Sequence, residues 1–426
     1  PRRPEFVTSA TKENRWLLLA VIAVLLIVFA ALSYGALATL SRHWDGAIAW
    51  DLKASFLTEN PTLSQPFFQS QQVIHHSRDY PLLQPLLVAL TERAFGAGRV
   101  VFPIAWMMAA SAVLLMLRRQ GASWTSAGLG AVAFACTPML ISPTSGSVDS
   151  GYAEATLAAW LTMAAVGCVL KDARWIVCGV VLAVLTKPEG VVYAALLLGA
   201  SWLQGCRGVL RPAALGCTIG VVLLLFLQHE LQFVDRVAPP IAALLLPVLL
   251  VGGMVWADAY LARKNLNRWR LRLAAALVIV GACASPWLVE LSGNPSGSLA
   301  RYMQDPLLVW QRLELVPVVI WRVLDYGMLH GWFGLGLPIL ALTVWRNRQT
   351  KGRTAPPALG LWVLLCVPCW CAAFLISDLE LAQHLRSRMP RLMLHATGLA
   401  WVYILATWQC SPRQGVVASG HSAAPA

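Results

Sequence analysis

Long apolar runs recur along this chain, separated by short loops rich in Arg and Lys, and this pattern constrains the fold more than any other feature. Several runs approach the roughly 20 apolar residues that an α-helix needs to cross a bilayer, and the first extends from Trp16 to Leu40. The runs are continuous rather than alternating, which favours helices over a β-barrel. Only 12% of the residues are charged, against about 25% in soluble domains. The sequence therefore predicts an all-α polytopic membrane protein.

The basic loops predict the orientation of these helices. The formal net charge is +13, and its excess falls in short loops such as Arg118-Arg119 and residues 263–272. If residues 81–95 form an amphipathic helix on the outer surface rather than a span, almost all of these loops fall on one side. The positive-inside rule makes that side cytoplasmic. This register predicts about 11 to 13 transmembrane helices, among them residues 125–142, 175–187, 190–204, 273–290 and 358–376. It assigns the basic residues to anionic lipid headgroups rather than nucleic acid.

The predicted organisation has three parts. Residues 1–15 form a cytoplasmic N-terminus, residues 16–408 a single transmembrane domain, and residues 409–426 a flexible cytoplasmic tail. Within the domain, residues 41–98 form a first outer loop and residues 292–330 a second, amphipathic outer segment. The first apolar run lacks a small-residue cleavage site and is too long for a signal peptide, so we interpret it as an anchor.

Polar residues on the predicted outer side are the candidate functional residues. Residues 42–85 follow the first span directly and concentrate many ionisable side chains. Three further groups lie on the same predicted side: Asp149 with Glu154, Lys187 with Glu189, and residues 378–391. A carboxylate there can act as a general base on a hydroxyl, and Lys and Arg can hold a phosphate. The pattern predicts transfer of a group from a lipid-linked phosphate donor whose tail enters from the bilayer.

Four motifs in the chain carry a family resemblance. The first motif runs from Trp44-Asp45-Gly46 through Trp50-Asp51-Leu52-Lys53-Ala54 and His76 to Asp79-Tyr80-Pro81-Leu82-Leu83. The second is Ser150-Gly151-Tyr152-Ala153-Glu154, and the third is Leu185-Thr186-Lys187-Pro188-Glu189-Gly190. The fourth combines His384-Leu385 with Arg391-Leu392. They resemble the first outer loop, the Gly-Tyr-Ala-Asp motif, the Leu-Thr-Lys segment and a late motif of bacterial GT-C glycosyltransferases. These enzymes are related to the protein O-mannosyltransferases and to the aminoarabinose and RgtA-type sugar transferases.

The resemblance implies a GT-C-like helical bundle with amphipathic juxtamembrane helices in the first outer loop. Such enzymes use a polyprenyl-phosphate sugar, invert the anomeric carbon and work on the periplasmic or lumenal face. It implies that Asp45 is the catalytic base and that Arg78 and Lys187 contact the donor phosphate. The other predicted substrate-binding residues are Lys53, His76, Asp79, Tyr80, Asp149, Glu154, Glu189, His384, Arg388 and Arg391.

The chain also departs from the family pattern in two places. Gly46 follows Asp45 where many relatives carry a second acid, which argues against a metal or second-carboxylate role there. Glu154 stands in place of Asp. Each candidate also has a structural interpretation: Asp45 can cap the next helix, and Lys187 can pair with Glu189 at the break before Pro188.

The predicted partners are a polyprenyl-phosphate sugar donor, the lipid bilayer and a hydroxyl acceptor of unknown kind, with no nucleic acid. The pattern requires no cofactor, a divalent metal is compatible but not indicated, and we predict no metal ligand. The predicted location is the bacterial inner membrane, with the site facing the periplasm or the outside. Two other functions stay open: a transporter or lipid flippase, which predicts broken helices in symmetric positions, and a non-catalytic subunit with the same fold.

Overall fold

The computed structural model describes residues 14–38, 46–69, 80–141, 147–230, 240–264, 266, 269–273, 312–325, 336–349, 355–376 and 381–409. Every regular element in these ranges is a helix, so the predicted all-helical class is confirmed for this part of the chain. Four of the described helices are long and apolar enough to cross a membrane, and four shorter apolar helices accompany them. These helices are compatible with an integral membrane protein, while the predicted count of spans stays a prediction.

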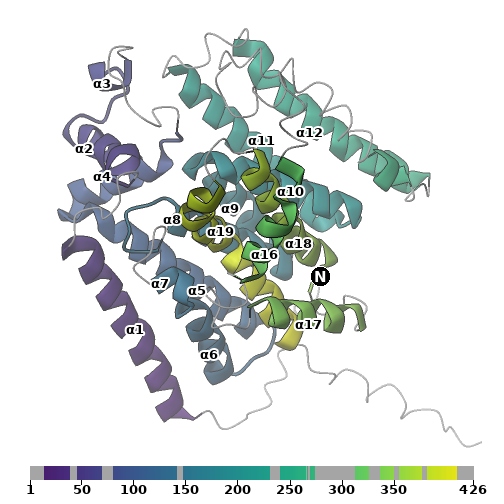
Figure 1. Cartoon of the computed structure of the whole chain (residues 1–426), viewed down its shortest axis with the longest axis horizontal. Coiled ribbons are helices and arrows are strands. Elements are labelled where there is room, and N and C mark those ends of the chain that lie inside the picture. Colours follow the sequence, from purple (N-terminus) through teal and green to yellow (C-terminus); the bar gives the residue numbers. More distant parts are fainter. Residues whose placement is uncertain are drawn as a thin grey trace, which may run out of the picture.

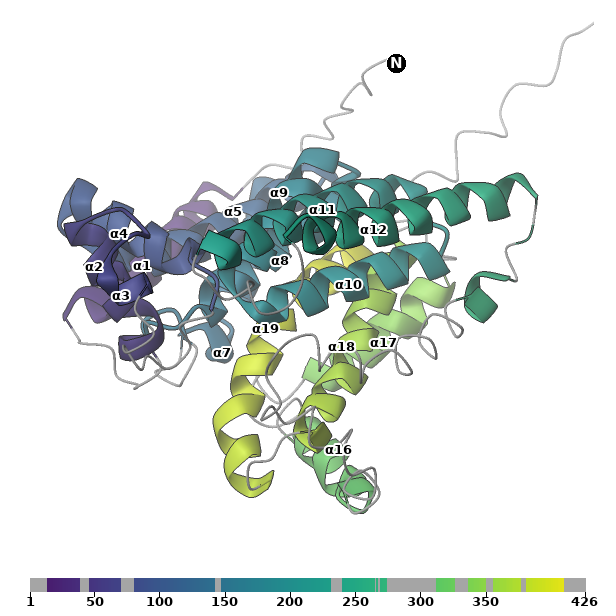
Figure 2. The same cartoon turned by 90° about the horizontal axis from the view of Figure 1, so that it is seen from above.

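The helices of the first half are α1 (Arg15–Ala38), the π-helix η1 (Gly46–Asp51), α2 (Leu52–Glu59), α3 (Pro66–Gln69), α4 (Leu83–Phe95), the 3₁₀ turn η2 (Gly98–Val100), α5 (Val101–Arg119), α6 (Trp124–Ala135), α7 (Pro138–Ile141), α8 (Glu154–Leu170) and α9 (Ala173–Thr186). Those of the second half are α10 (Pro188–Leu203), α11 (Arg207–Glu230), α12 (Pro240–Arg263), α16 (Val316–Asp325), α17 (Gly336–Gln349), α18 (Pro357–Ile376) and α19 (Leu381–Gln409). Helices α2, α3 and α4 gather at one corner of the molecule in both views (Figures 1 and 2).

Helix α8 is the centre of the bundle because it is apolar on all sides. A helix without a polar face must be buried on every side, and α8 packs against α5, α9 and α19. Helix α1 is equally apolar, but it lies at the edge of the bundle beside α6 (Figure 1). Only 11% of the residues in its most apolar 18-residue stretch are buried within the protein. Its exposed apolar side chains, including Trp16 and Ile27, are compatible with a lipid environment.

Close contact between α8 and α9 depends on a glycine. A Cβ at Gly179 would lie 2.6 Å from the backbone nitrogen of Ala164 and 2.7 Å from the carbonyl oxygen of Trp160. Small residues allow helix backbones to approach in this way within membranes. The two helices run antiparallel, so the last residues of α9 lie beside Glu154, the first residue of α8.

Several predicted segments differ from the observed helices at their ends. Residues 81–95 contain α4, whose 13 residues are too few to cross a bilayer. The prediction of one continuous span over residues 125–142 was wrong, because the structure has two helices there, α6 and α7. Pro138 disfavours helical backbone at the preceding residue and begins the second helix. Of the predicted span 273–290, the structure describes residue 273 alone. Of the predicted amphipathic segment 292–330, it describes residues 312–325, which include α16.

The two ends of the bundle carry different side chains. Near the middle of α19, Arg391 reaches Glu154. Towards the last turn of α19, Arg346 of α17 lies over the Trp408 ring at 4.4 Å, and Leu405 lies beside Gly130, which also contacts Leu117 of α5. The last turns of α5, α12 and α17 all carry Arg. We call this the basic end, and the opposite end, where Glu154 lies, the carboxylate end.

Candidate functional site

Four charged side chains meet at the carboxylate end. Lys187 Nζ lies 2.9 Å from Glu154 Oε1 and 2.9 Å from Glu189 Oε1. Arg391 donates from Nε to the same oxygen of Glu154. All four were predicted as substrate-binding residues, from three separate motifs. The fold therefore joins three of those motifs in one ion network, which we call the Glu154 network.

The local backbone explains how each of these residues reaches the network. Glu154 begins α8, where the helix dipole favours a negative charge. Lys187 lies between α9 and α10 in extended backbone (φ −158°, ψ 149°), and Pro188 opens α10 at a position that suits proline. Arg391 projects from the long helix α19, directly after Pro390. The pairing of Lys187 with Glu189, expected at the break before Pro188, is present.

Three members of the Glu154 network are almost sealed from solvent, while the Glu189 side chain is 33% exposed. The exposed fractions are 0% for Glu154, 2% for Lys187 and 6% for Arg391. Buried charges are stable only when they are paired and hydrogen-bonded. Two carboxylates face two cations here, so the network is balanced in charge, and removal of one member would leave a buried charge without compensation.

The Arg391 guanidinium is also held from its flat side. Its central carbon lies 4.3 Å from the centre of the Tyr152 ring, a cation–π contact. Tyr152 follows a turn in which Gly151 has a positive φ of 80°, and in the same turn Asp149 Oδ1 accepts a 2.7 Å hydrogen bond from the Ser147 hydroxyl. Asp149 is 8% exposed. Residues 147–153 thus form a buried loop beside the network.

The first outer loop packs onto this buried loop. The Trp50 and Tyr80 rings lie 5.5 Å apart, and Trp50 is clustered with Ala153, the residue before Glu154. Lys53 is fully buried and donates from Nζ to the Tyr80 carbonyl at 3.3 Å. The hydrogen bond between Lys53 and Tyr80, both predicted site residues, therefore connects two parts of the first loop at the carboxylate end.

Asp51 and Arg99 extend the polar region towards α5. Arg99 Nε lies 3.8 Å from Asp51 Oδ2, and its Nη2 approaches the Asp149 carbonyl at 3.5 Å. Burial raises the pKa of Asp51 to about 6, although the charge of Arg99 acts in the opposite direction. Neither residue was a predicted site residue. The signal for Asp51 was its place in the first motif, two residues before Lys53.

A second set of buried side chains was missed from the sequence. The Tyr193 hydroxyl lies 3.3 Å from His395 Nδ1 and 3.2 Å from the Leu392 carbonyl, and it accepts a 3.1 Å hydrogen bond from Trp370 Nε1. His395 is fully buried, and its Nε2 has no hydrogen-bond partner in the part of the chain that the structure describes. His395 lies four residues after Arg391 and so on the same face of α19. This spacing is the sequence feature from which His395 could have been predicted as a neighbour of the Glu154 network.

The other predicted site residues are only partly described. Asp45, His76, Arg78 and Asp79 lie outside the described residues, as does the side chain of His384. Arg388, one turn before Arg391 on α19, is partly buried. Their predicted roles stay predictions.

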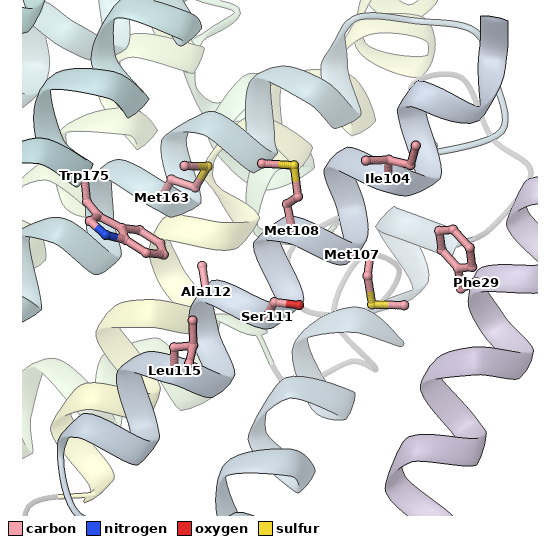
Figure 3. A pocket seen from close by; sticks show the side chains of 9 residues that line it. All are labelled: Phe29, Ile104, Met107, Met108, Ser111, Ala112, Leu115, Met163 and Trp175. Carbon is pink, nitrogen blue, oxygen red and sulfur yellow. The ribbon is translucent and has the colours of Figure 1, made fainter. Parts of the chain in front are cut away.

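An apolar groove runs along α5 between α1, α8 and α9. Its cavity volume is about 340 Å³. Figure 3 shows Met107, Met108 and Met163 in the groove, between Phe29 of α1 and Trp175 of α9. None of the described residues that line it is charged. The lining residues of α5 begin about one and a half helical turns after Arg99 and continue to Leu115, a length of roughly 16 Å.

Comparisons with protein-family models, with curated proteins and with solved structures found no match to this chain. Within the described ranges, no group of three or more His, Cys, Asp or Glu side chains is arranged to hold a metal ion. The carboxylates and cations at the carboxylate end are of the types that can accept a proton or hold a phosphate.

Proposed function

We propose that this chain is a GT-C-type membrane glycosyltransferase that moves a sugar from a polyprenyl-phosphate donor to an acceptor hydroxyl. The observation that carries the proposal is the Glu154 network. It brings together Glu154, Lys187 and Arg391, which belong to three separate motifs that resemble those of such enzymes. The remaining motif, in the first loop, contributes Trp50, which packs beside Ala153.

In the proposed reaction, Asp45 accepts the proton of the acceptor hydroxyl while the hydroxyl oxygen attacks the anomeric carbon. The bond from that carbon to the phosphate oxygen breaks, and its electron pair leaves with the polyprenyl phosphate. Attack from the face opposite the leaving group inverts the anomeric carbon. Cations near the leaving phosphate stabilise its increased negative charge.

The burial of the Glu154 network supports a division of roles. Lys187 is enclosed by Glu154 and Glu189, so we assign it to positioning rather than to direct phosphate contact. Arg391 is fixed by Glu154 and by the Tyr152 ring. A guanidinium held in this way is preorganised, and together with Arg388 on the same face of α19 it is our candidate for holding the donor phosphate.

The apolar groove supports a lipid-linked donor. It starts close to Arg99 at the carboxylate end and continues along α5 between apolar side chains (Figure 3). We propose that the polyprenyl chain lies in this groove while its phosphate lies at the carboxylate end. By the positive-inside rule the basic end faces the cytoplasm, so the reaction would take place at the periplasmic or outer face.

A transfer assay with a polyprenyl-phosphate sugar tests the catalytic assignment. The purified Asp45→Asn protein should show a turnover at least about 100-fold lower than wild type, with an unchanged thermal unfolding midpoint. Near wild-type turnover by the folded variant would refute Asp45 as the base. Binding of the donor with no turnover by the wild-type chain would favour a transporter or a non-catalytic subunit.

A binding assay tests the donor site separately from the chemistry. Farnesyl phosphate serves as a short isoprenoid phosphate, and farnesol as its uncharged control. We expect Arg388→Gln to weaken farnesyl phosphate binding about tenfold or more, while Asp45→Asn leaves it unchanged. Ser111→Trp, which fills the groove from an exposed position, should weaken binding of both probes. Equal binding of both probes by wild type would contradict a phosphate site.

A further inference from the structure

The basic end contains an ion cluster that differs from the Glu154 network in its charge balance. Arg207 Nε lies 3.0 Å from Asp258 Oδ2, and Arg270 Nη2 lies 2.7 Å from Asp258 Oδ1. Two guanidinium groups thus share one carboxylate, and the cluster carries an excess of one positive charge. We call it the Asp258 triad.

The Asp258 triad, which carries the excess charge, is largely buried. Asp258 is 3% exposed and Arg270 8%, and no described residue forms a hydrogen bond with the buried Arg270 Nε. The Arg270 guanidinium lies directly over Gly205, which has a positive φ of 65°, and it occupies the space that a side chain at residue 205 would need. A buried donor without a partner costs free energy unless something accepts its hydrogen bond.

The arginine on the other side of the triad opens towards solvent. The Arg207 side chain is 43% exposed, so an anion can reach the cluster from that side. Phosphate groups accept hydrogen bonds from two guanidinium groups at once, which suits this arrangement. An anionic ligand would neutralise the excess charge that Asp258 leaves.

The surroundings of the triad fit the boundary of a membrane. Arg272 lies 4.8 Å over the Trp269 ring, and Trp256 stacks on Tyr260 at 5.6 Å between ring centres. Trp256 is 69% exposed and Leu271 70%. Exposed Trp and Tyr beside Arg are typical of the headgroup region of a bilayer, and basic residues there attract anionic lipids. Figure 2 shows α11 and α12, which carry Arg207 and Asp258, side by side along one face of the bundle.

We propose that the Asp258 triad binds the phosphate of an anionic phospholipid headgroup. Arg270 and Arg207 hold the phosphate oxygens, Asp258 neutralises one of the two guanidinium charges, and the acyl chains cover the exposed aromatic and apolar side chains. The site is separate from the Glu154 network, and it does not depend on the function proposed for that network.

The full chain in neutral detergent tests the site. Dioleoyl phosphatidylglycerol is the anionic probe, dioleoyl phosphatidylcholine the zwitterionic control, and inorganic phosphate the headgroup-free control. We expect wild type to bind phosphatidylglycerol at least about fivefold more tightly than phosphatidylcholine. The Arg207→Gln variant, which keeps the pair of Arg270 with Asp258, should lose most of this preference.

Two further variants separate binding from general charge and from structure. Arg119→Gln removes one exposed positive charge at the same end and should keep the preference. Asp258→Asn releases both arginines, so phosphatidylglycerol should bind several-fold more tightly although the protein without lipid is less stable. A purely structural triad would predict only the loss of stability.

Besides an unchanged lipid affinity in Asp258→Asn, three results would overturn the proposal. One is an unchanged lipid preference in Arg207→Gln. Another is an equal loss of preference in Arg119→Gln, which would indicate that the positive charge of the whole basic end attracts anionic lipid without a defined binding site. The third is a response to inorganic phosphate equal to that for phosphatidylglycerol at the same concentration, which would assign the site to a free anion.

Discussion

The Glu154 network and the Asp258 triad are both buried ion clusters, one at each end of the same bundle, but they differ in charge. The Glu154 network pairs two cations with two carboxylates, so its charges balance. The Asp258 triad places two guanidinium groups on one carboxylate. The comparison indicates that burial of charge serves two purposes in this chain: at one end it holds side chains in a fixed geometry, and at the other it leaves an excess that can attract an anion.

The largest expected effect comes from Glu154→Gln. This change leaves Lys187 and Arg391 buried with one carboxylate fewer, and such losses cost about 3 to 5 kcal/mol. The thermal unfolding midpoint in detergent should fall accordingly. Asp258→Asn should cost less, because the Arg207 side chain is 43% exposed and can regain water. An equal loss in the two variants would remove the distinction between the clusters.

A double variant tests whether the cost arises from uncompensated charge. In Glu154→Gln/Lys187→Gln the number of cations falls with the number of carboxylates, so the loss should be smaller than the sum of the two single losses. The coupling free energy of the double-mutant cycle measures this difference. Simple additivity would mean that the two side chains contribute independently.

Asp51 provides the next largest effect, and it depends on pH. Its pKa is raised to about 6, so between pH 4 and pH 6 the folded state binds a proton that the unfolded state has lost. Stability should therefore fall as pH rises through this window, by about 2 to 3 kcal/mol. The Asp51→Asn variant should lose this component of the pH dependence and be the more stable protein at pH 7.5, as thermal unfolding at pH 4.5 and 7.5 would measure. An identical pH profile in both proteins would contradict the raised pKa.

Tyr193→Phe should have a moderate effect beside the Glu154 network. The change removes the acceptor for Trp370 Nε1 and the hydroxyl group beside His395 Nδ1. Buried groups left without a partner cost about 1 to 3 kcal/mol. The matched control is Tyr260→Phe near the basic end, where the side chain is 47% exposed and the expected change is within about 0.5 kcal/mol. Thermal unfolding of both variants gives the comparison.

The smallest expected effect belongs to an ion pair on the surface. Arg322 Nη1 lies 3.5 Å from Asp325 Oδ2 on α16, and the Arg322 side chain is 57% exposed. Exposed pairs of this kind contribute less than about 1 kcal/mol. Arg322→Gln should therefore leave the unfolding midpoint almost unchanged, and a loss comparable to that of Glu154→Gln would show that burial does not separate these classes of ion pair.

Much of the fold could be predicted because membrane helices carry their own signal. Apolar runs and short basic loops located helices such as α9, α10 and α18 to within a few residues, since each must satisfy its backbone hydrogen bonds internally. The break at Thr137 was missed because the surrounding residues are apolar on both sides of it. The participation of His395 was missed because a single histidine in an apolar helix has no signal of its own without its neighbours.

Composition and local pattern were enough to predict an all-helical chain, with helices compatible with a membrane protein and with charges unevenly distributed, because hydrophobicity and helix length act on each segment separately. They also selected Glu154, Lys187, Glu189 and Arg391 as candidates. Only the packing of distant helices decided that these four share one buried network and that Asp258 is shared by two arginines. Those outcomes depend on which side chains meet in space, and pairing of buried charge is a property of the assembled interior rather than of any one segment.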